Sequence, residues 1–100
     1  MNVEFKNKEL VKLYVSGKST KYSIPLNTAE LFVLRVFQLK SAHSIKDIKK
    51  TKFFNFFKPV KLKNTFRINI CNESKLEFQI EWLDDKETVG TIFITDLIFD

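Results

Sequence analysis

The chain has 100 residues, of which 44% are hydrophobic and 29% are charged, and its formal net charge is +5 at pH 7. This apolar content excludes a disordered tail, and no apolar run approaches the roughly 18–20 residues that a membrane-spanning helix needs. The single cysteine, Cys71, excludes an internal disulfide and favours a reducing compartment. Because the first residues contain no hydrophobic segment of a signal peptide, we expect a cytoplasmic protein with one domain over residues 1–100.

The charge is divided unevenly along the chain. Residues 1–63 contain fourteen Lys/Arg and four Asp/Glu, a net charge of +10, whereas residues 64–100 contain three and eight, a net charge of −5. A basic segment of this size favours a polyanionic partner. The acidic remainder is equally consistent with a solvated face, a patch that neutralises the basic one, or a second contact surface.

The N-terminal residues predict a short strand followed by a short helix. Residues 2–6 alternate polar and apolar side chains, which is typical of a strand with one buried face. Asn7 is predicted to cap a helix over residues 8–15, and Gly17 to end it in the left-handed conformation. A basic loop over residues 17–25 follows.

A longer helix is predicted to begin at Asn27, because Glu30 follows it at capping-box spacing. Its apolar side chains leave only a narrow polar stripe, so we expect this helix to pack on two sides, against a sheet and against the first helix. Residues 44–52 predict a short, solvated helical turn with Ile45 and Ile48 directed inward.

The rest of the chain predicts strands. Residues 55–61 are a candidate edge strand, because they contain a proline, which cannot donate to a ladder. Residues 66–71 and 76–82 alternate apolar and polar side chains and predict a hairpin, and residues 91–98 predict a last strand. The predicted order is β-α-α-β-β-β, an α+β fold with two N-terminal helices packed on one face of an antiparallel sheet.

The register of the hairpin decides which polar side chains meet. If Ile68 lies opposite Phe78, then Arg67 lies opposite Gln79, with Glu77 and Glu81 on its diagonals. Arg67 is therefore either a ligand for a phosphate group or the cross-strand ion-pair partner of one of these glutamates.

Four segments resemble the HigB branch of the RelE/ParE superfamily, the toxins of bacterial toxin–antitoxin modules. They are residues 10–22, 34–48, 75–82 and 87–98, and their order and spacing carry the resemblance more than any one motif. The resemblance covers nearly the whole chain. It implies a RelE/ParE-like fold and a ribosome-dependent endoribonuclease that cuts mRNA in the ribosomal A site. It also implies a cognate helix-turn-helix antitoxin of the HigA type as a partner.

An enzyme of this kind needs a basic surface for phosphates, cationic stabilisation of a pentacoordinate phosphate, and an acid and a base for the two reacting oxygens. Attack by the 2′-hydroxyl would leave a 2′,3′-cyclic or a 3′-phosphate end. No metal is required in principle, and the sequence has no His/Cys/Asp cluster with ligand spacing. We therefore expect neither a metal nor another cofactor.

The resemblance places the candidate catalytic residues on the hairpin and around it. The family's first arginine corresponds to Asn69 or, with a longer hairpin turn, to Arg67, and both project from one face. Its second arginine corresponds to Lys75, which keeps the charge without the bidentate fork. The family's C-terminal His-Tyr pair has no counterpart, and Asp100 stands where the histidine would lie. Lys61 is a further candidate cation.

Lysines supply the candidate RNA contacts. They lie in the first loop, in the helical turn at 44–52 and just before the hairpin: Lys18, Lys21, Lys49, Lys50, Lys52, Lys58 and Lys63. The alternative is that these lysines are ordinary solvated side chains, and lysines along an edge strand also discourage aggregation.

Two other functions stay open. Relatives of the ParE type act on DNA gyrase instead of mRNA, and the missing His-Tyr pair keeps that alternative in place. The other alternative is a degenerate homologue that binds RNA or antitoxin without cutting.

Four phenylalanines near residue 55 are too many to bury in one strand and predict a contact surface for a partner such as an antitoxin: Phe53, Phe54, Phe56 and Phe57.

Overall fold

The computed structural model describes residues 1–99. The order of its helices and strands is β1 (Asn2–Phe5), α1 (Lys8–Ser16), α2 (Leu26–Ser41), α3 (Ile45–Lys50), the 3₁₀ turn η1 (Lys52–Phe54), β2 (Thr65–Cys71), β3 (Ser74–Trp82) and β4 (Gly90–Phe99). The α+β class and the predicted order of strands and helices are confirmed. None of the helices in the described residues is long and apolar enough to cross a bilayer.

The four strands form one sheet in the order β1-β4-β3-β2. Strands β2, β3 and β4 make the predicted antiparallel meander, but β1 pairs in parallel with β4, with Val3 opposite Ile92, so the sheet is mixed. Alternation predicts that a strand exists but not its direction, which here depends on the path of the chain through α1 and α2.

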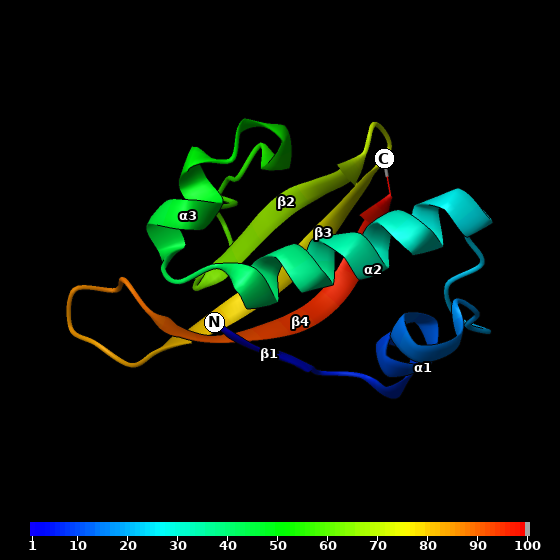
Figure 1. Cartoon of the computed structure of the whole chain (residues 1–100), viewed down its shortest axis with the longest axis horizontal. Coiled ribbons are helices and arrows are strands. Elements are labelled where there is room, and N and C mark those ends of the chain that lie inside the picture. The colour runs from blue at the N-terminus through cyan, green and yellow to red at the C-terminus, as the bar shows by residue number, and fades with distance from the viewer. Residues whose placement is uncertain (100) are drawn as a thin grey trace.

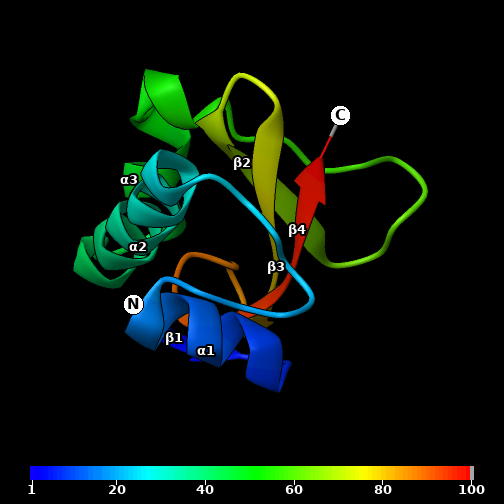
Figure 2. The ribbon, with the colours of Figure 1, turned by 90° about the vertical axis from the view of Figure 1, so that its right-hand side faces the viewer.

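Helices α1, α2 and α3 cover one face of the sheet (Figures 1 and 2), and the loop of residues 57–64 projects on the opposite side (Figure 2). Helix α2 contacts α1 as well as β1 and β2, which confirms its predicted two-sided packing. The fully buried side chains of this layer include Phe32 and Val36 of α2 and Phe78 of β3. Burial of such large apolar groups supplies most of the driving force for folding.

The caps of the first helix are as predicted, whereas the start of the second is not. The Asn7 side chain accepts a hydrogen bond from the Leu10 N–H at 2.8 Å, and Gly17 ends α1 at a φ of 75°. Helix α2 begins at Leu26, directly after Pro25, and the Asn27 side chain accepts only from the neighbouring Thr28 N–H. Pro25 is the N-cap residue, with φ −60° and ψ 151°, so the helix begins one residue before the predicted start at Asn27.

The edge strand predicted at 55–61 is wrong. In its place the chain makes η1, a left-handed residue at Asn55 with a φ of 48°, and a loop. Only one isolated bridge remains, in which Phe57 and Arg67 exchange two backbone hydrogen bonds of 3.1 and 2.9 Å. Pro59 follows two residues later and cannot donate, so the pairing does not continue.

The register of the hairpin differs from the expected one by two residues. Ile68 lies opposite Leu76, Phe66 opposite Phe78, and Arg67 opposite Glu77. A shift of two residues keeps each side chain on its expected face, so the apolar residues still reach the core. The shift makes Glu77, which was expected on a diagonal, the direct neighbour of Arg67.

Candidate functional site

The face of the β2–β3 hairpin that points away from the helices carries the predicted catalytic side chains. Along both strands most residues facing the helices are buried, and Arg67, Asn69, Lys75 and Glu77 on the other face are partly exposed. Arg67 and Asn69 of β2 lie directly opposite Glu77 and Lys75 of β3. Three of the candidate catalytic residues, Arg67, Asn69 and Lys75, are therefore neighbours on one open surface.

Arg67 and Glu77 form a half-buried ion pair. The Arg67 Nη2 and Nε atoms lie 2.9 and 3.1 Å from the same Glu77 oxygen, Oε2, and the two side chains are 22% and 16% exposed. The other carboxylate oxygen accepts a hydrogen bond of 3.1 Å from Thr95 Oγ1 on β4. Arg67 is thus held in place by β3 and β4, and one edge of its guanidinium is already occupied.

Phe57 anchors the loop of residues 57–64 at this face. Its ring centroid lies 6.0 Å from the Arg67 guanidinium carbon and 5.9 Å from Lys75 Nζ, and its backbone pairs with Arg67. Both cations therefore lie beside one aromatic ring, as in a cation–π arrangement. The sequence singled out Phe57 only as one of four crowded phenylalanines, because an isolated bridge leaves no alternating pattern.

Arg35 of α2 supports the other end of β2. Its Nε donates to the Asn69 carbonyl at 2.9 Å and its Nη2 donates to the Ile70 carbonyl at 3.3 Å, where the β2–β3 ladder is irregular. Burial lowers the pKa of Arg35. This contact, which the sequence did not reveal, fixes the backbone that carries Asn69.

A buried tyrosine braces β4 beside Thr95. The Tyr22 hydroxyl donates to Asp96 Oδ1 at 2.6 Å, and Asn7 Nδ2 donates to the Thr95 carbonyl at 3.3 Å. Burial, together with the hydrogen bond to Asp96, raises the pKa of Tyr22 to about 12. These contacts hold the irregular part of β4, where the register shifts between Glu77 and Phe78 of its partner.

The predicted RNA-contacting lysines do not form one surface. Lys58 and Lys63, together with the candidate catalytic Lys61, lie in or beside the loop that projects on the hairpin's open side (Figure 2). The lysines at 49, 50 and 52 lie on α3 and η1 with the helices. Lys18 and Lys21 precede α2, at the end of that helix away from α3 (Figure 1). Asp100 lies outside the described residues.

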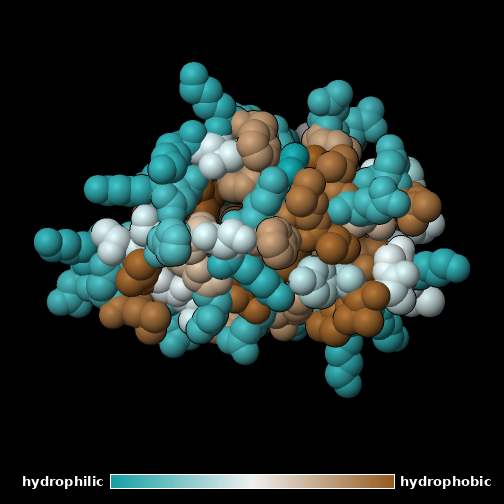
Figure 3. All heavy atoms as spheres, viewed as in Figure 1, coloured by the Kyte–Doolittle hydropathy of each residue, from teal (hydrophilic) through white to brown (hydrophobic). Residues whose placement is uncertain are grey.

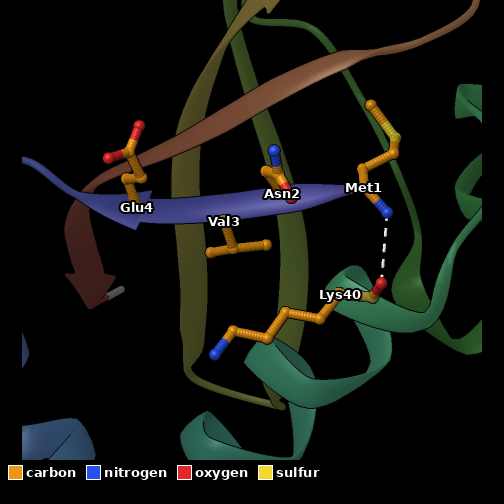
Figure 4. Close-up of a pocket in the computed structure, with 5 residues that line it drawn as sticks. All are labelled: Met1, Asn2, Val3, Glu4 and Lys40. Atoms are coloured by element: carbon orange, nitrogen blue, oxygen red, sulfur yellow. Dashed lines mark hydrogen bonds between the residues drawn. The ribbon is translucent and has the colours of Figure 1, made fainter.

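Two hollows among the described residues lie away from the hairpin face. One, of about 540 Å³, lies between the residues at 1–4 and Lys40, where the N-terminal amine donates to the Lys40 carbonyl at 3.1 Å (Figure 4). The other, of about 450 Å³, lies between α2, α3 and η1. On the hairpin, Arg67 and Lys75 lie beside the same Phe57 ring on a strand face, an arrangement that suits an extended polymer with phosphates. Within residues 1–99 no three His, Cys, Asp or Glu side chains are placed to hold a metal ion.

No protein-family model and no curated protein matches the sequence. Among solved structures, the chain is similar to a YoeB/ParE toxin from Agrobacterium tumefaciens, with a TM-score of 0.54 over 100% of this chain and 99% of that chain. The chain has the fold of that toxin. The identity is 13%, so the likeness extends to the fold and leaves the roles of individual residues to be argued from geometry.

Proposed function

We propose that this protein is the toxin of a bacterial toxin–antitoxin module, and that it cuts mRNA on the ribosome without a metal. The observation that carries the proposal is the grouping of Arg67, Asn69 and Lys75 with the Phe57 ring on the open face of the hairpin. The toxin fold of the structural neighbour and the HigB-like segments support the same reading.

The proposed reaction is attack of the mRNA 2′-oxygen on the adjacent phosphorus. The bond to the 5′-oxygen breaks, that oxygen takes up a proton, and a 2′,3′-cyclic phosphate remains. Arg67 and Lys75 would stabilise the added negative charge of the pentacoordinate phosphate. A phosphate that binds Arg67 would compete with Glu77 for the guanidinium, and the carboxylate released from this ion pair is proposed to accept the 2′-hydroxyl proton.

The remaining candidates keep the roles that the sequence suggested. Lys61 is proposed as a further cation, and Asp100 as a proton shuttle. Lys58 and Lys63 would bind flanking phosphates from the loop beside the hairpin. We place the protein in the cytoplasm with a HigA-like helix-turn-helix antitoxin, and with the ribosome and mRNA as its targets.

A second candidate is a homologue that binds RNA or antitoxin without cutting. The observation in its favour is the Arg67–Glu77 pair, because it neutralises the one arginine of the hairpin face. In that case the same surface grips phosphates but leaves the barrier to cleavage unchanged.

The deciding experiment is cleavage of a defined mRNA with and without 70S ribosomes at fixed salt. We expect ribosome-dependent cuts, 2′,3′-cyclic or 3′-phosphate ends, and no cut where the attacking nucleotide is 2′-deoxy. Changing Arg67 and Lys75 together to alanine should abolish cutting, whereas the charge-matched pair Lys8→Ala with Lys86→Ala should not. Folded protein that binds RNA but never cuts would favour the binding-only function, and intact mRNA with gyrase-linked DNA damage would favour a ParE-type toxin.

A further inference from the structure

The hollow between α2, α3 and η1 combines exposed aromatic rings with polar groups. Phe37 and Phe53 are 62% and 56% exposed at its rim, although Phe54 beneath them is buried. Figure 1 shows α3 and the following turn beside the C-terminal half of α2, and Figure 3 shows hydrophobic side chains exposed among hydrophilic ones over α2. Large aromatic rings left in water at a hollow mark a binding surface.

Phe53 is prepared as a stacking surface. The Arg35 guanidinium carbon lies 4.9 Å from its ring centroid, and the Phe54 ring meets it edge-on at 5.0 Å. Arg35 is itself fixed by the β2 carbonyls and by Gln38, whose Oε1 accepts from Arg35 Nη1 at 3.0 Å. The ring is therefore held by its neighbours, and more than half of its surface remains open to a ligand.

Polar groups and cations surround the two rings. Five of the nine residues that line the hollow are polar: Gln38, Ser41, Asp47, Lys50 and Thr51. The amide oxygen of Gln38 is engaged by Arg35, which leaves its amide nitrogen to donate to a ligand. Residues 44–52 carry four lysines and one aspartate, and that aspartate is occupied by the His43 N–H at 2.8 Å and by Lys50 at 3.4 Å.

We propose that this hollow binds an unstacked base of single-stranded RNA, with Phe37 and Phe53 stacking on the base and the lysines at 49, 50 and 52 on the flanking phosphates. A mixed apolar and polar lining fits a planar base with hydrogen-bonding edges better than it fits a run of aliphatic side chains from a protein. The surrounding positive charge fits the phosphates. The proposal rests on the proposed function only for the class of partner, RNA, and it adds a contact on the side of the sheet opposite the hairpin's open face.

The test is binding of a fluorescein-labelled single-stranded RNA of about ten nucleotides. Phe37→Leu and Phe53→Leu keep apolar bulk but remove the ring, and each should weaken binding about tenfold. Phe53→Trp should retain the affinity. Phe93→Leu is the matched control, because Phe93 also lies beside a lysine, with Lys6 at 4.6 Å, but it lies on strand β4, away from the hollow between the helices. Its change should leave binding unchanged.

All variants are measured in the background of Arg67→Ala with Lys75→Ala, so that the hairpin face contributes little and cleavage plays no part. A tenfold loss in this background supports the stacking site even if the protein never cuts mRNA. The proposal is overturned if both leucine variants bind RNA as tightly as the parent protein with Arg67→Ala and Lys75→Ala. It is also overturned if Phe93→Leu weakens RNA binding as much as they do. A protein partner would occupy the hollow instead if two results came together. RNA binding would be unchanged by the substitutions, and antitoxin binding would survive Phe53→Leu but be lost in Phe53→Ser.

Discussion

Arg67 is both the best candidate for a phosphate ligand and the partner of Glu77. Changing Glu77 to glutamine removes the counter-charge but keeps the size of the side chain. We expect the variant to lose about 1–2 kcal/mol of unfolding free energy, because a half-buried guanidinium loses a charged hydrogen-bond partner. The same change should tighten RNA binding, because Arg67 no longer has to leave a carboxylate. Urea unfolding and fluorescence anisotropy measure the two effects.

Glu81→Gln is the control for this prediction, because Glu81 lies four residues further along β3 and is exposed. Glu81→Gln should change the free energy of unfolding little, and it should change RNA affinity only through the loss of one negative charge. Weaker RNA binding by Glu77→Gln, at unchanged fold, would indicate that the carboxylate contributes to binding and does not compete with it.

Tyr22 makes stability depend on pH at the alkaline end. Its pKa is about 12 in the folded chain, because of burial and the bond to Asp96, against an ordinary 10.0. The unfolded chain therefore loses this proton first as the pH rises, so the stabilisation is complete below pH 10 and is lost between pH 10 and 12. At neutral pH, Tyr22→Phe should be less stable than the native chain by about 1–2 kcal/mol.

The gap between Tyr22→Phe and the native chain should close as the pH approaches 12, in denaturant unfolding measured at several pH values. Tyr14→Phe removes the other tyrosine and serves as the control for general alkaline effects. A gap that stays constant from neutral to strongly alkaline pH would contradict the assignment of a bound proton to Tyr22.

At the scale of single residues, the sequence predicted on which face of a strand a side chain lies better than it predicted which side chain that residue contacts. Alternation placed Arg67, Asn69 and Lys75 on one face whichever register the hairpin took, since every allowed register keeps parity. It could not choose between Glu77 and Glu81 as the ion-pair partner, because that choice depends on the tight turn between β2 and β3. Phe57 and Arg35 were missed because an isolated bridge and a bond to a backbone carbonyl leave no repeating pattern.

The two glycines, Gly17 and Gly90, resist substitution for different physical reasons. Gly17 ends α1 at a φ of 75°, and a Cβ there would meet nothing within 4 Å, so Gly17→Ala should cost about 1 kcal/mol through backbone conformation alone. At Gly90 a Cβ would lie 2.5 Å from the Glu81 carbonyl oxygen, so Gly90→Ala must move β3 and β4 apart. We expect a cost of about 2–3 kcal/mol in urea unfolding.

Gly17→Asn separates the two causes, because asparagine accepts the left-handed conformation better than alanine does. It should recover part of the stability that Gly17→Ala loses, whereas Gly90→Asn should be at least as damaging as Gly90→Ala. Equal costs at the two positions would argue against a steric limit between β3 and β4.

At the scale of elements, local sequence patterns predicted which helices and strands form, whereas long-range pairing decided how the strands are arranged in the sheet. The Asn7 cap, the Gly17 terminus and the meander of β2, β3 and β4 follow from short motifs and alternation. The parallel pairing of β1 with β4 joins residues about ninety positions apart, so no local pattern records it. The false strand at 55–61 has apolar residues that instead serve the bridge at Phe57 and the stack of Phe56 on Phe66.

At the scale of the molecule, the basic charge of the first two-thirds of the chain reaches both sides of the sheet. The lysines at 58, 61 and 63 belong to the loop on the open side of the hairpin, and those at 49, 50 and 52 belong to the helical side. The described chain measures 38 × 26 × 24 Å, so a large RNA such as the ribosome can contact both groups only by enclosing the protein. A charge count along the sequence cannot distinguish this arrangement from one continuous patch.

If the protein binds the ribosome as proposed, contact with rRNA on both sides predicts that the two groups of lysines contribute separately to the affinity. Changing either group to glutamine should lower the slope of log affinity against log salt by about 2–3, since each phosphate contact contributes about 0.7–0.9. The two losses should nearly add, because the lysines of the two groups do not contact one another directly; Lys49 and Lys58 are linked only through the stacked rings of Phe56 and Phe66. A charge-matched set elsewhere, Lys8, Lys12 and Lys86, should change the slope by less than about 1. If only one group alters the slope, the ribosome contacts one side of the protein, and the lysines of the other side are solvated side chains or serve the antitoxin.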